Sequence, residues 1–260
     1  VFSIGNDLFG EGIFCGKGVV RIKEFYELVA KAFPKGKILS HDIPEGNILR
    51  TAYISDAVFY DDIPDDIVSF TERGCRWIRG DIQNTLFLKK SYVNGKRQRV
   101  ANEMGLWGKY LIFNNAVSAF YFPSIFFLVL SSIFFGIFPV ITAVLLFFFE
   151  DICTLFESLF RKVEIIKIRK RNRFSSGTAL RFSDRLLSFI CLPYIAVKNL
   201  AAIIRAIYAM KTGKGLLEWK TAASLGGKGR KLKNYFLKMY PQYIGVLLLF
   251  FSQTVFVGIL

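Results

Sequence analysis

A run of 40 residues without a charged side chain, from Tyr110 to Phe149, constrains this chain more than any other feature. A helix needs roughly 20 residues to cross the hydrocarbon core of a bilayer, so the run is long enough for two crossings. Gly136 and Pro139 lie where a tight turn between two crossings would fall. We therefore predict a transmembrane hairpin over residues 110–160, with both of its ends on the same side of the membrane.

Two later segments are also apolar. Residues 239–260 are uncharged and about one membrane thick, which predicts a transmembrane helix that the end of the chain truncates. The apolar stretch from Leu186 to Val197 is only 12 residues long, and Lys198 and Arg205 follow it on one helical face. Such a segment favours a helix lying in the membrane interface, with a third crossing as the second interpretation.

The net charge of +15 is concentrated in one place. Residues 161–238 hold 19 Lys and Arg against three acids, a balance of +16, so the rest of the chain sums to about −1. A basic segment between apolar runs is typical of the cytoplasmic side of a membrane protein, and it argues against nucleic acid as a partner. We therefore predict an integral membrane protein in which 161–238 is a basic cytoplasmic or interfacial helical segment and 1–109 is also cytoplasmic.

Several common functional sites are excluded. The four cysteines form no CxxC pair or zinc-site spacing, and His41 is the sole histidine. The string GEGIFCGKG resembles a phosphate loop, but it has three residues instead of four before Gly16-Lys17, and Gly18 stands where Ser or Thr is needed. We expect no metal site built from residues of this chain.

Residues 1–109 mix helical and strand-like patterns. Apolar residues at helical spacing predict helices from Ile22 to Phe33 and from Ile67 to about Leu88, and Thr51–Ile54 is strand-like. Two short motifs stand out in this region. One is Ser40-His41-Asp42 followed by Glu45-Gly46, and the other runs from Arg73 to Asp81 and contains Arg76-Trp77.

Together these motifs resemble the paired signatures of processive, inverting glycosyltransferases of the family-2 type. The strings DLFGEGIFCGKG, ILSHDIPEG, RWIRGDIQ and LLEWKTAAS occur in the order found in cyclic β-1,2-glucan synthases, glycosyltransferase family 84. The resemblance spans residues 7–224, membrane segments included. It implies an α/β C-terminal half of a GT-A-like glycosyltransferase domain at 1–109, on the acceptor side, followed by α-helical transmembrane and interfacial segments.

The resemblance assigns the catalytic base to Asp42. An inverting transferase needs a base near the acceptor hydroxyl, and a carboxylate can take that proton in the transition state. The alternative is that Asp42 only caps a helix or turn. His41 stands where relatives have an acid; it either orients the substrate-binding site or has a plain packing role.

Arg73, Arg76 and Trp77 are predicted to bind substrate. Residues three apart share a helical face, guanidinium groups stabilise a departing diphosphate, and an indole ring can stack on a sugar. The alternative is a basic helix anchored at the membrane surface by a tryptophan. The resemblance adds Glu11 and Gly12 as sugar-binding residues. The acids Asp61, Asp62, Asp65 and Asp66 are read as a solvated loop, and Arg79 and Asp81 either pair with each other or support the site.

The chain begins at Val1 and ends at Leu260 within an apolar run, so we expect it to be a piece of a larger protein. The family holds its donor and a divalent cation, Mg or Mn, through a DxD motif that we expect upstream of this segment. The expected substrates are UDP-glucose and a β-glucan acceptor, at a bacterial inner membrane. Two alternatives stay open: another processive synthase, of the cellulose, chitin or hyaluronan type, and a non-catalytic membrane scaffold.

Overall fold

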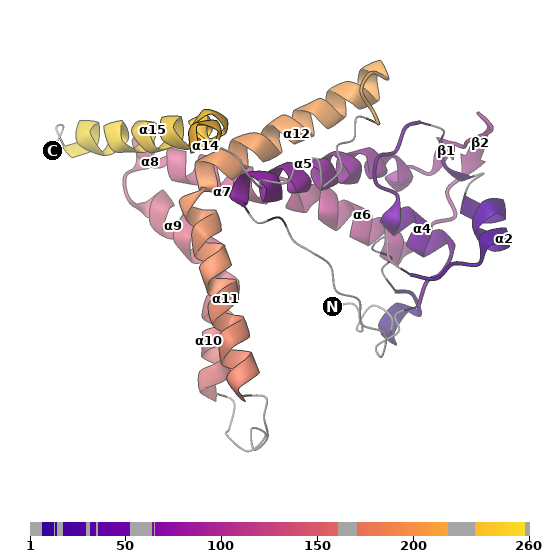
Figure 1. The fold of residues 1–260 in the computed structure, drawn as a ribbon, viewed down its shortest axis with the longest axis horizontal. Coiled ribbons are helices and arrows are strands. Elements are labelled where there is room, and N and C mark those ends of the chain that lie inside the picture. Colours follow the sequence, from indigo (N-terminus) through magenta and orange to yellow (C-terminus); the bar gives the residue numbers. More distant parts are fainter. Residues whose placement is uncertain are drawn as a thin grey trace. The chain divides into compact units, whose positions relative to one another are not determined.

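The computed structural model describes residues 7–12, 14, 18–29, 32–34, 36–52, 64, 66–160, 171–217 and 232–257; side chains are not described at 157–160, 171–179 and 251–257. The chain divides into two compact units (Figure 1). Unit 1 comprises residues 1–120 and 198–230, and unit 2 comprises residues 121–197 and 231–260.

Unit 1 is built from short helices around one long helix. Its elements in chain order are α2 Ile22–Glu24, the π-helical turn η1 Phe25–Val29, α4 Asp42–Ile48, α5 Ile67–Asn84, the 3-10 turn η2 Thr85–Leu88, β1 Ser91–Val93, β2 Arg99–Ala101 and α6 Leu106–Ser118, joined by α12 Leu192–Thr212 from Lys198 onward.

The helix predicted from Ile67 to about Leu88 is confirmed as α5 followed by η2. The carboxylate of Asp66 caps α5 by accepting hydrogen bonds from the backbone N–H groups of Val68 and Ser69, at 3.0 Å each. Asp66 is therefore a helix cap and not part of a solvated loop, whereas Asp61, Asp62 and Asp65 lie outside the described residues. Of the helix predicted from Ile22 to Phe33, the structure describes α2 and η1 over Ile22–Val29 and a helical residue at Ala32, whereas residues 30 and 31 lie outside the described residues.

The predicted α/β class is wrong, because the described residues are mostly helical. Their only strands are β1 and β2, an antiparallel hairpin of two three-residue strands in which Tyr92 pairs with Val100. Of the strand expected at Thr51–Ile54, only the first two residues are described, and neither is in a strand. The N–H of Thr51 instead bonds back to the carbonyl of Gly46 and closes the end of α4. A four-residue apolar run is too short to distinguish a strand from such a helix ending.

Two apolar clusters hold unit 1 together. In one, Ile82 of α5 packs with Ala116 of α6 and with Ile203 and Ala206 of α12. In the other, Phe87 of η2 packs with Ile38, Met104 and Ile112. The first cluster fixes α5, which carries the Arg and Trp residues of the second motif, and the second cluster fixes η2, which follows α5 directly.

Unit 2 consists of helices only among its described residues. They are α7 Tyr121–Leu130, α8 Ser132–Phe135, α9 Phe138–Phe147, α10 Phe149–Phe160, α11 Arg171–Ile190, the first turns of α12, α14 Leu232–Lys238 and α15 Tyr240–Val257. The chain turns at Gly136, whose φ of 68° is a conformation that side chains disfavour, so that α7 and α9 pack side by side. The predicted turn is thus where the sequence placed it.

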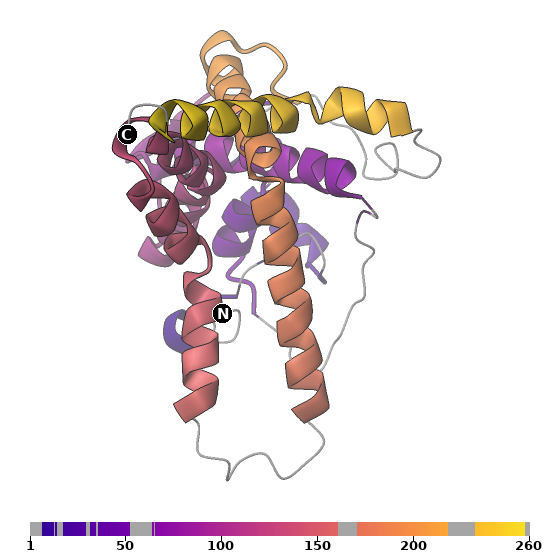
Figure 2. The same cartoon turned by 90° about the vertical axis from the view of Figure 1, so that its left-hand side faces the viewer.

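The core of unit 2 is apolar and rich in phenylalanine. Phe126, Ala143, Phe147 and Leu192 are buried in one cluster. Between α10 and α11, which lie side by side in Figures 1 and 2, Arg185 pairs with the carboxylates of Glu150 and Asp151.

Among the described residues, two helical stretches are long and apolar enough to cross a membrane: Leu106–Phe135, of 30 residues, and Leu192–Thr212, of 21 residues. The pair α9–α10 passes the same test together but is bent by 60° between its two helices. These stretches indicate membrane association. The second stretch is longer than the apolar segment on which the interfacial prediction rested, so by length and composition it fits the crossing that was the second interpretation.

Candidate active site

The Ser-His-Asp motif lies at the start of α4. His41 is the residue that precedes the helix and makes no side-chain capping bond, and Asp42 is the first helical residue. The main chain at His41 accepts the first helical hydrogen bond, from the N–H of Glu45 at 2.8 Å. Asp42 is therefore not the N-cap residue of α4, but it is one of two acids in the first turn of this helix.

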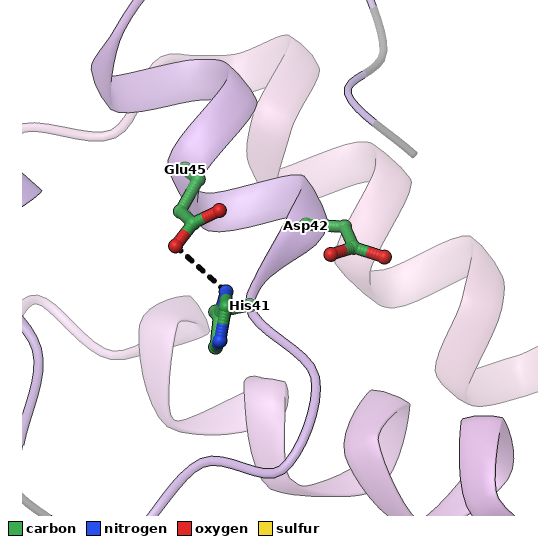
Figure 3. Close-up of side chains that lie close together, drawn as sticks. All are labelled: His41, Asp42 and Glu45. Atoms are coloured by element: carbon green, nitrogen blue, oxygen red, sulfur yellow. Dashed lines mark ion pairs between the residues drawn. The ribbon is translucent and has the colours of Figure 1, made fainter. Parts of the chain in front are cut away.

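Glu45 and His41 form a close ion pair one helical turn apart (Figure 3). The distance between Glu45 Oε1 and His41 Nδ1 is 2.7 Å, and the Glu45 side chain is almost fully buried. The hydrogen bond to Glu45 raises the pKa of His41 above its ordinary value, against the opposing effect of partial burial. The pair fixes Nδ1 as the protonated nitrogen and leaves Nε2 for other partners.

Burial also acts on two carboxyl groups of unit 1. Partial desolvation raises the pKa of Asp42, and the neighbouring His41 and Arg76 act in the opposite direction. Burial raises the pKa of Asp81 to about 6, helped by the negative charge of Asp42 and opposed by a hydrogen bond from the Asn115 amide at 3.3 Å. The two carboxyl groups therefore influence each other's ionisation.

A cleft of about 420 Å³ joins the two sequence motifs. Its lining comprises Ile38, Leu39, Ser40, His41, Asp42, Arg76, Trp77 and Leu217. His41 and Asp42 come from the start of α4, whereas Arg76 and Trp77 come from the middle of α5. Four of the predicted site residues thus line one cleft.

Arg73 lies one turn before Trp77 on α5. Its guanidinium carbon is 4.9 Å from the centre of the Trp77 ring and 5.6 Å from that of Phe70, both within cation–π range. Trp77 is 47% exposed. Arg73 itself does not line the cleft but contacts the ring of Trp77, which does.

The close approach of the two motifs depends on two residues of α5 that were not singled out from the sequence. The backbone at Ser40 packs so tightly on Gly80 that a Cβ there would lie 2.4 Å from that of Ser40. The fully buried Gln83 accepts a hydrogen bond from the N–H of Leu39 at 2.7 Å and donates one to the carbonyl of Leu216 at 3.1 Å.

Gln83 thereby ties the Ser-His-Asp loop and the segment before Leu217 to the same helix. Arg79 adds a second tie by donating to the carbonyl of Gly215 at 2.9 Å. Both residues could have been found from the sequence, because the string RWIRGDIQ, on which the family resemblance rests, contains Gly80 and ends with Gln83.

Glu11 and Gly12 lie at the other end of α4 and do not line the cleft. Glu11 Oε2 accepts a hydrogen bond from the Asn47 amide at 2.6 Å, and the N–H of Gly12 bonds to the carbonyl of Thr51. Glu11 and Gly12 therefore contact α4, the helix that begins with Asp42, and the segment that follows it.

His41, Asp42 and Glu45 also form a group that could hold a metal ion, since one ligand atom of each lies within 4.8 Å of the others. The group does not fit the Mg or Mn that the family resemblance implies. Mg²⁺ prefers six oxygen ligands in octahedral geometry, whereas His41 Nδ1 and Glu45 are bonded to each other here (Figure 3).

No family model matches the chain. It is 25% identical over 270 aligned residues to the cyclic beta-(1,2)-glucan synthase NdvB of Rhizobium meliloti (strain 1021). The alignment covers 92% of this chain and 8% of the relative. The chain is thus a distant homologue of a glucan synthase. The resemblance noted in the motifs is confirmed as homology to a cyclic beta-(1,2)-glucan synthase, over a small part of that protein's length.

Proposed function

We propose that this chain forms the acceptor side of a membrane-bound inverting glucosyltransferase that transfers glucose from UDP-glucose to a growing β-1,2-glucan. The supporting observation is that one cleft unites a carboxylate, an imidazole, a guanidinium and an indole from two distant motifs. The homology to a cyclic beta-(1,2)-glucan synthase points to the same chemistry.

In this proposal Asp42 takes the proton from the acceptor hydroxyl as that oxygen bonds to C1 of glucose. The bond between C1 and the diphosphate oxygen breaks, and UDP leaves with the electron pair. Arg76, and His41 when it is protonated, favour the ionised form of Asp42 and oppose the burial that raises its pKa. Arg76 also stabilises the negative charge of the departing diphosphate.

Trp77 offers its half-exposed ring to the apolar face of a sugar unit of the acceptor. Glu11 and Gly12 support the site through α4. The cleft faces the cytoplasm of a bacterial cell, and the membrane-length helices hold it at the inner membrane. The family's divalent cation binds outside this segment.

The test is Asp42→Asn in the full-length protein that contains this chain, with Glu24→Gln on the exposed surface as a matched loss of one carboxylate. We expect Asp42→Asn to lower glucan synthesis about 10²–10⁴-fold with unchanged membrane insertion, because it removes a general base. Glu24→Gln should leave synthesis unchanged. Normal synthesis by the Asp42→Asn protein would instead support the non-catalytic scaffold, and analysis of the product's linkages separates β-1,2-glucan from the polymers of other processive synthases.

A further inference from the structure

One face of α6 is apolar and exposed in unit 1. Leu106, Tyr110, Phe113 and Val117 are each more than half exposed and recur at spacings of four, three and four residues. Residues at this spacing form one stripe along a helix. The opposite side of α6 carries the buried Ile112 and Ala116. The stripe is therefore an outward face and not part of the core.

A second segment continues this face through stacked aromatic rings. The ring of Phe9 stacks on Trp107, with centroids 4.4 Å apart and planes 13° apart, and Trp107 stacks on Tyr110 at 5.5 Å and 20°. Phe9 is 50% exposed, and the neighbouring Leu8 is 71% exposed. Residues 8 and 9 thus extend the apolar surface of α6, although almost 100 residues separate them from it in the sequence.

The length of the helical stretch indicates what covers this surface. The stretch Leu106–Phe135 has 30 residues. At about 1.5 Å per residue it is roughly 45 Å long, whereas the hydrocarbon core of a bilayer is about 30 Å thick. About 15 Å therefore extends beyond the hydrocarbon into the headgroup region. Trp and Tyr are enriched at that level, which matches the position of Trp107 and Tyr110 near the start of the stretch.

We propose that Leu8 and Phe9, stacked on Trp107, form an interfacial anchor that lies among the lipid headgroups beside the first turns of α6. The anchor connects the membrane surface to the candidate active site through a short path. Glu11 follows Phe9 by two residues and accepts from Asn47 of α4, and Asn47 also packs against Gly108 of α6 so closely that a Cβ there would lie 2.6 Å away. The anchor thus fixes the depth of α4 relative to the membrane, whatever sugar chemistry the cleft performs.

The experiment places a bimane fluorophore on single cysteines in the full chain, reconstituted in nanodiscs, with the four native cysteines replaced by serine. The labelled variants are Leu8→Cys, Phe113→Cys on the α6 stripe, and Tyr26→Cys as a control residue on η1 that is 64% exposed. Quenching is measured with nitroxide lipids labelled at the headgroup, at acyl carbon 5 or at acyl carbon 16.

We expect headgroup and carbon-5 nitroxides to quench position 8 more than the carbon-16 nitroxide does. Position 113 should be quenched most by the acyl-chain nitroxides, and position 26 by none of them. Quenching at position 8 as weak as at position 26 would overturn the anchor. An unquenched position 113 would overturn it as well, because the α6 stripe would then not face lipid.

A second variant tests the role of the aromatic stack. Phe9→Ala should lower the quenching at position 8 at least twofold and leave position 113 unchanged, because the segment loses its contact with Trp107. Tyr26→Ala is the matched control and should not change the quenching at position 8 or at position 113. Unchanged quenching at position 8 in Phe9→Ala would show that the stack does not hold the segment at the membrane.

Discussion

Each of the two units holds a segment against a helix in the same two ways: a glutamine side chain bonds two backbone groups, and a glycine allows close contact. In unit 1, Gln83 bonds the backbone of Leu39 and Leu216. In unit 2, Gln242 accepts from the N–H of Tyr194 at 3.3 Å and donates to the carbonyl of Ile190 at 2.7 Å. Each unit also has a glycine, Gly80 in unit 1 and Gly245 in unit 2, where an added Cβ would lie 2.4 Å from a neighbouring Cβ.

The two units differ in which segment the glutamine and the glycine hold in place. Gln242 and Gly245 fasten α15 to the backbone around Pro193, where helices meet. Gln83 and Gly80 fasten irregular backbone whose side chains line the cleft. The described residues of unit 1 also bury six polar side chains, and those of unit 2 bury one, Ser132; the six are Glu45, Ser69, Thr71, Gln83, Asn84 and Asn199. Of these six, Gln83 holds loop backbone through its bonds to Leu39 and Leu216, whereas Ser69 and Thr71 bond to Asp66 and Ile67 at the start of α5.

The largest effect that separates the units is expected for the two glutamines. Gln83→Ala leaves two backbone groups without their hydrogen-bond partner, at a cost of about 1–3 kcal/mol each. It also releases the backbone at Leu39 and at Leu216, next to residues that line the cleft. We expect a large loss of thermal stability together with loss of glucan synthesis in the full-length protein. Gln242→Ala, the matched variant, should lose less stability because its side chain is less buried, and synthesis should persist.

The variant Gln83→Glu sharpens this comparison, because an ionised Glu keeps the acceptor for Leu39, loses the donor to Leu216 and adds a buried negative charge. We expect it to lose at least as much synthesis as Gln83→Ala. Equal losses of synthesis in Gln83→Ala and Gln242→Ala would show that the Gln83 hydrogen bonds matter no more for the cleft than those of Gln242.

The pH dependence of stability is the next largest effect, and it belongs to unit 1. The folded-state pKa of Asp81 is raised to about 6 from 3.8, so the folded protein holds this proton more tightly than the unfolded chain does. Stability from this group is therefore full below about pH 4 and is lost as the pH rises to about 6, by at most about 3 kcal/mol. Asp81→Asn should flatten the fall in unfolding temperature between pH 4 and 6. Some fall should remain, because the pKa of Asp42 is raised too. An unchanged pH profile in Asp81→Asn would contradict the burial of this carboxyl group.

The glycine pair tests the same comparison with matched steric changes. Gly80→Ala and Gly245→Ala each force a displacement that costs about 1–3 kcal/mol, typical of overpacking. We expect similar losses of thermal stability for the two variants but a loss of synthesis only for Gly80→Ala, because Ser40 must move and His41 and Asp42 follow it. Equal synthesis by both variants would show that the loop position does not control the cleft.

The smallest effect is expected at the cap of α5. Asp66→Ala removes three hydrogen bonds to the first turn, two from backbone N–H groups and one from the Ser69 hydroxyl, and should cost about 0.5–2 kcal/mol of stability. The cleft residues Arg76 and Trp77 lie ten and eleven residues further along the helix, so glucan synthesis by the full-length protein should stay the same. Lower synthesis at unchanged protein level would indicate that the cap positions the cleft as well as the helix. Asp66→Asn should restore most of the stability, because Asn is also a good capping residue.

The local features of this protein could be predicted from its amino-acid sequence. Helical spacing predicted α5 from Ile67 onward, and the uncharged run with Gly136 predicted the turn between α7 and α9. The paired motifs around Asp42 and Trp77 pointed to one site and to glucan synthases, and homology bears out that relationship. These features could be predicted because they depend on the spacing of nearby residues, and in a helix that spacing fixes which side chains lie on the same face.

The remaining features depend on how distant segments pack together. The helical class of unit 1, the Glu45 side chain behind His41, the clamp of Gln83 and the raised pKa of Asp81 were not apparent in the sequence. Each depends on which segments meet and how much water they exclude. Leu39 and Leu216 lie 44 and 133 residues from Gln83, and no pattern of local spacing predicts that they bond to the same side chain. Contacts between distant segments are set by the packing of the whole chain, and so are the pKa values that burial controls.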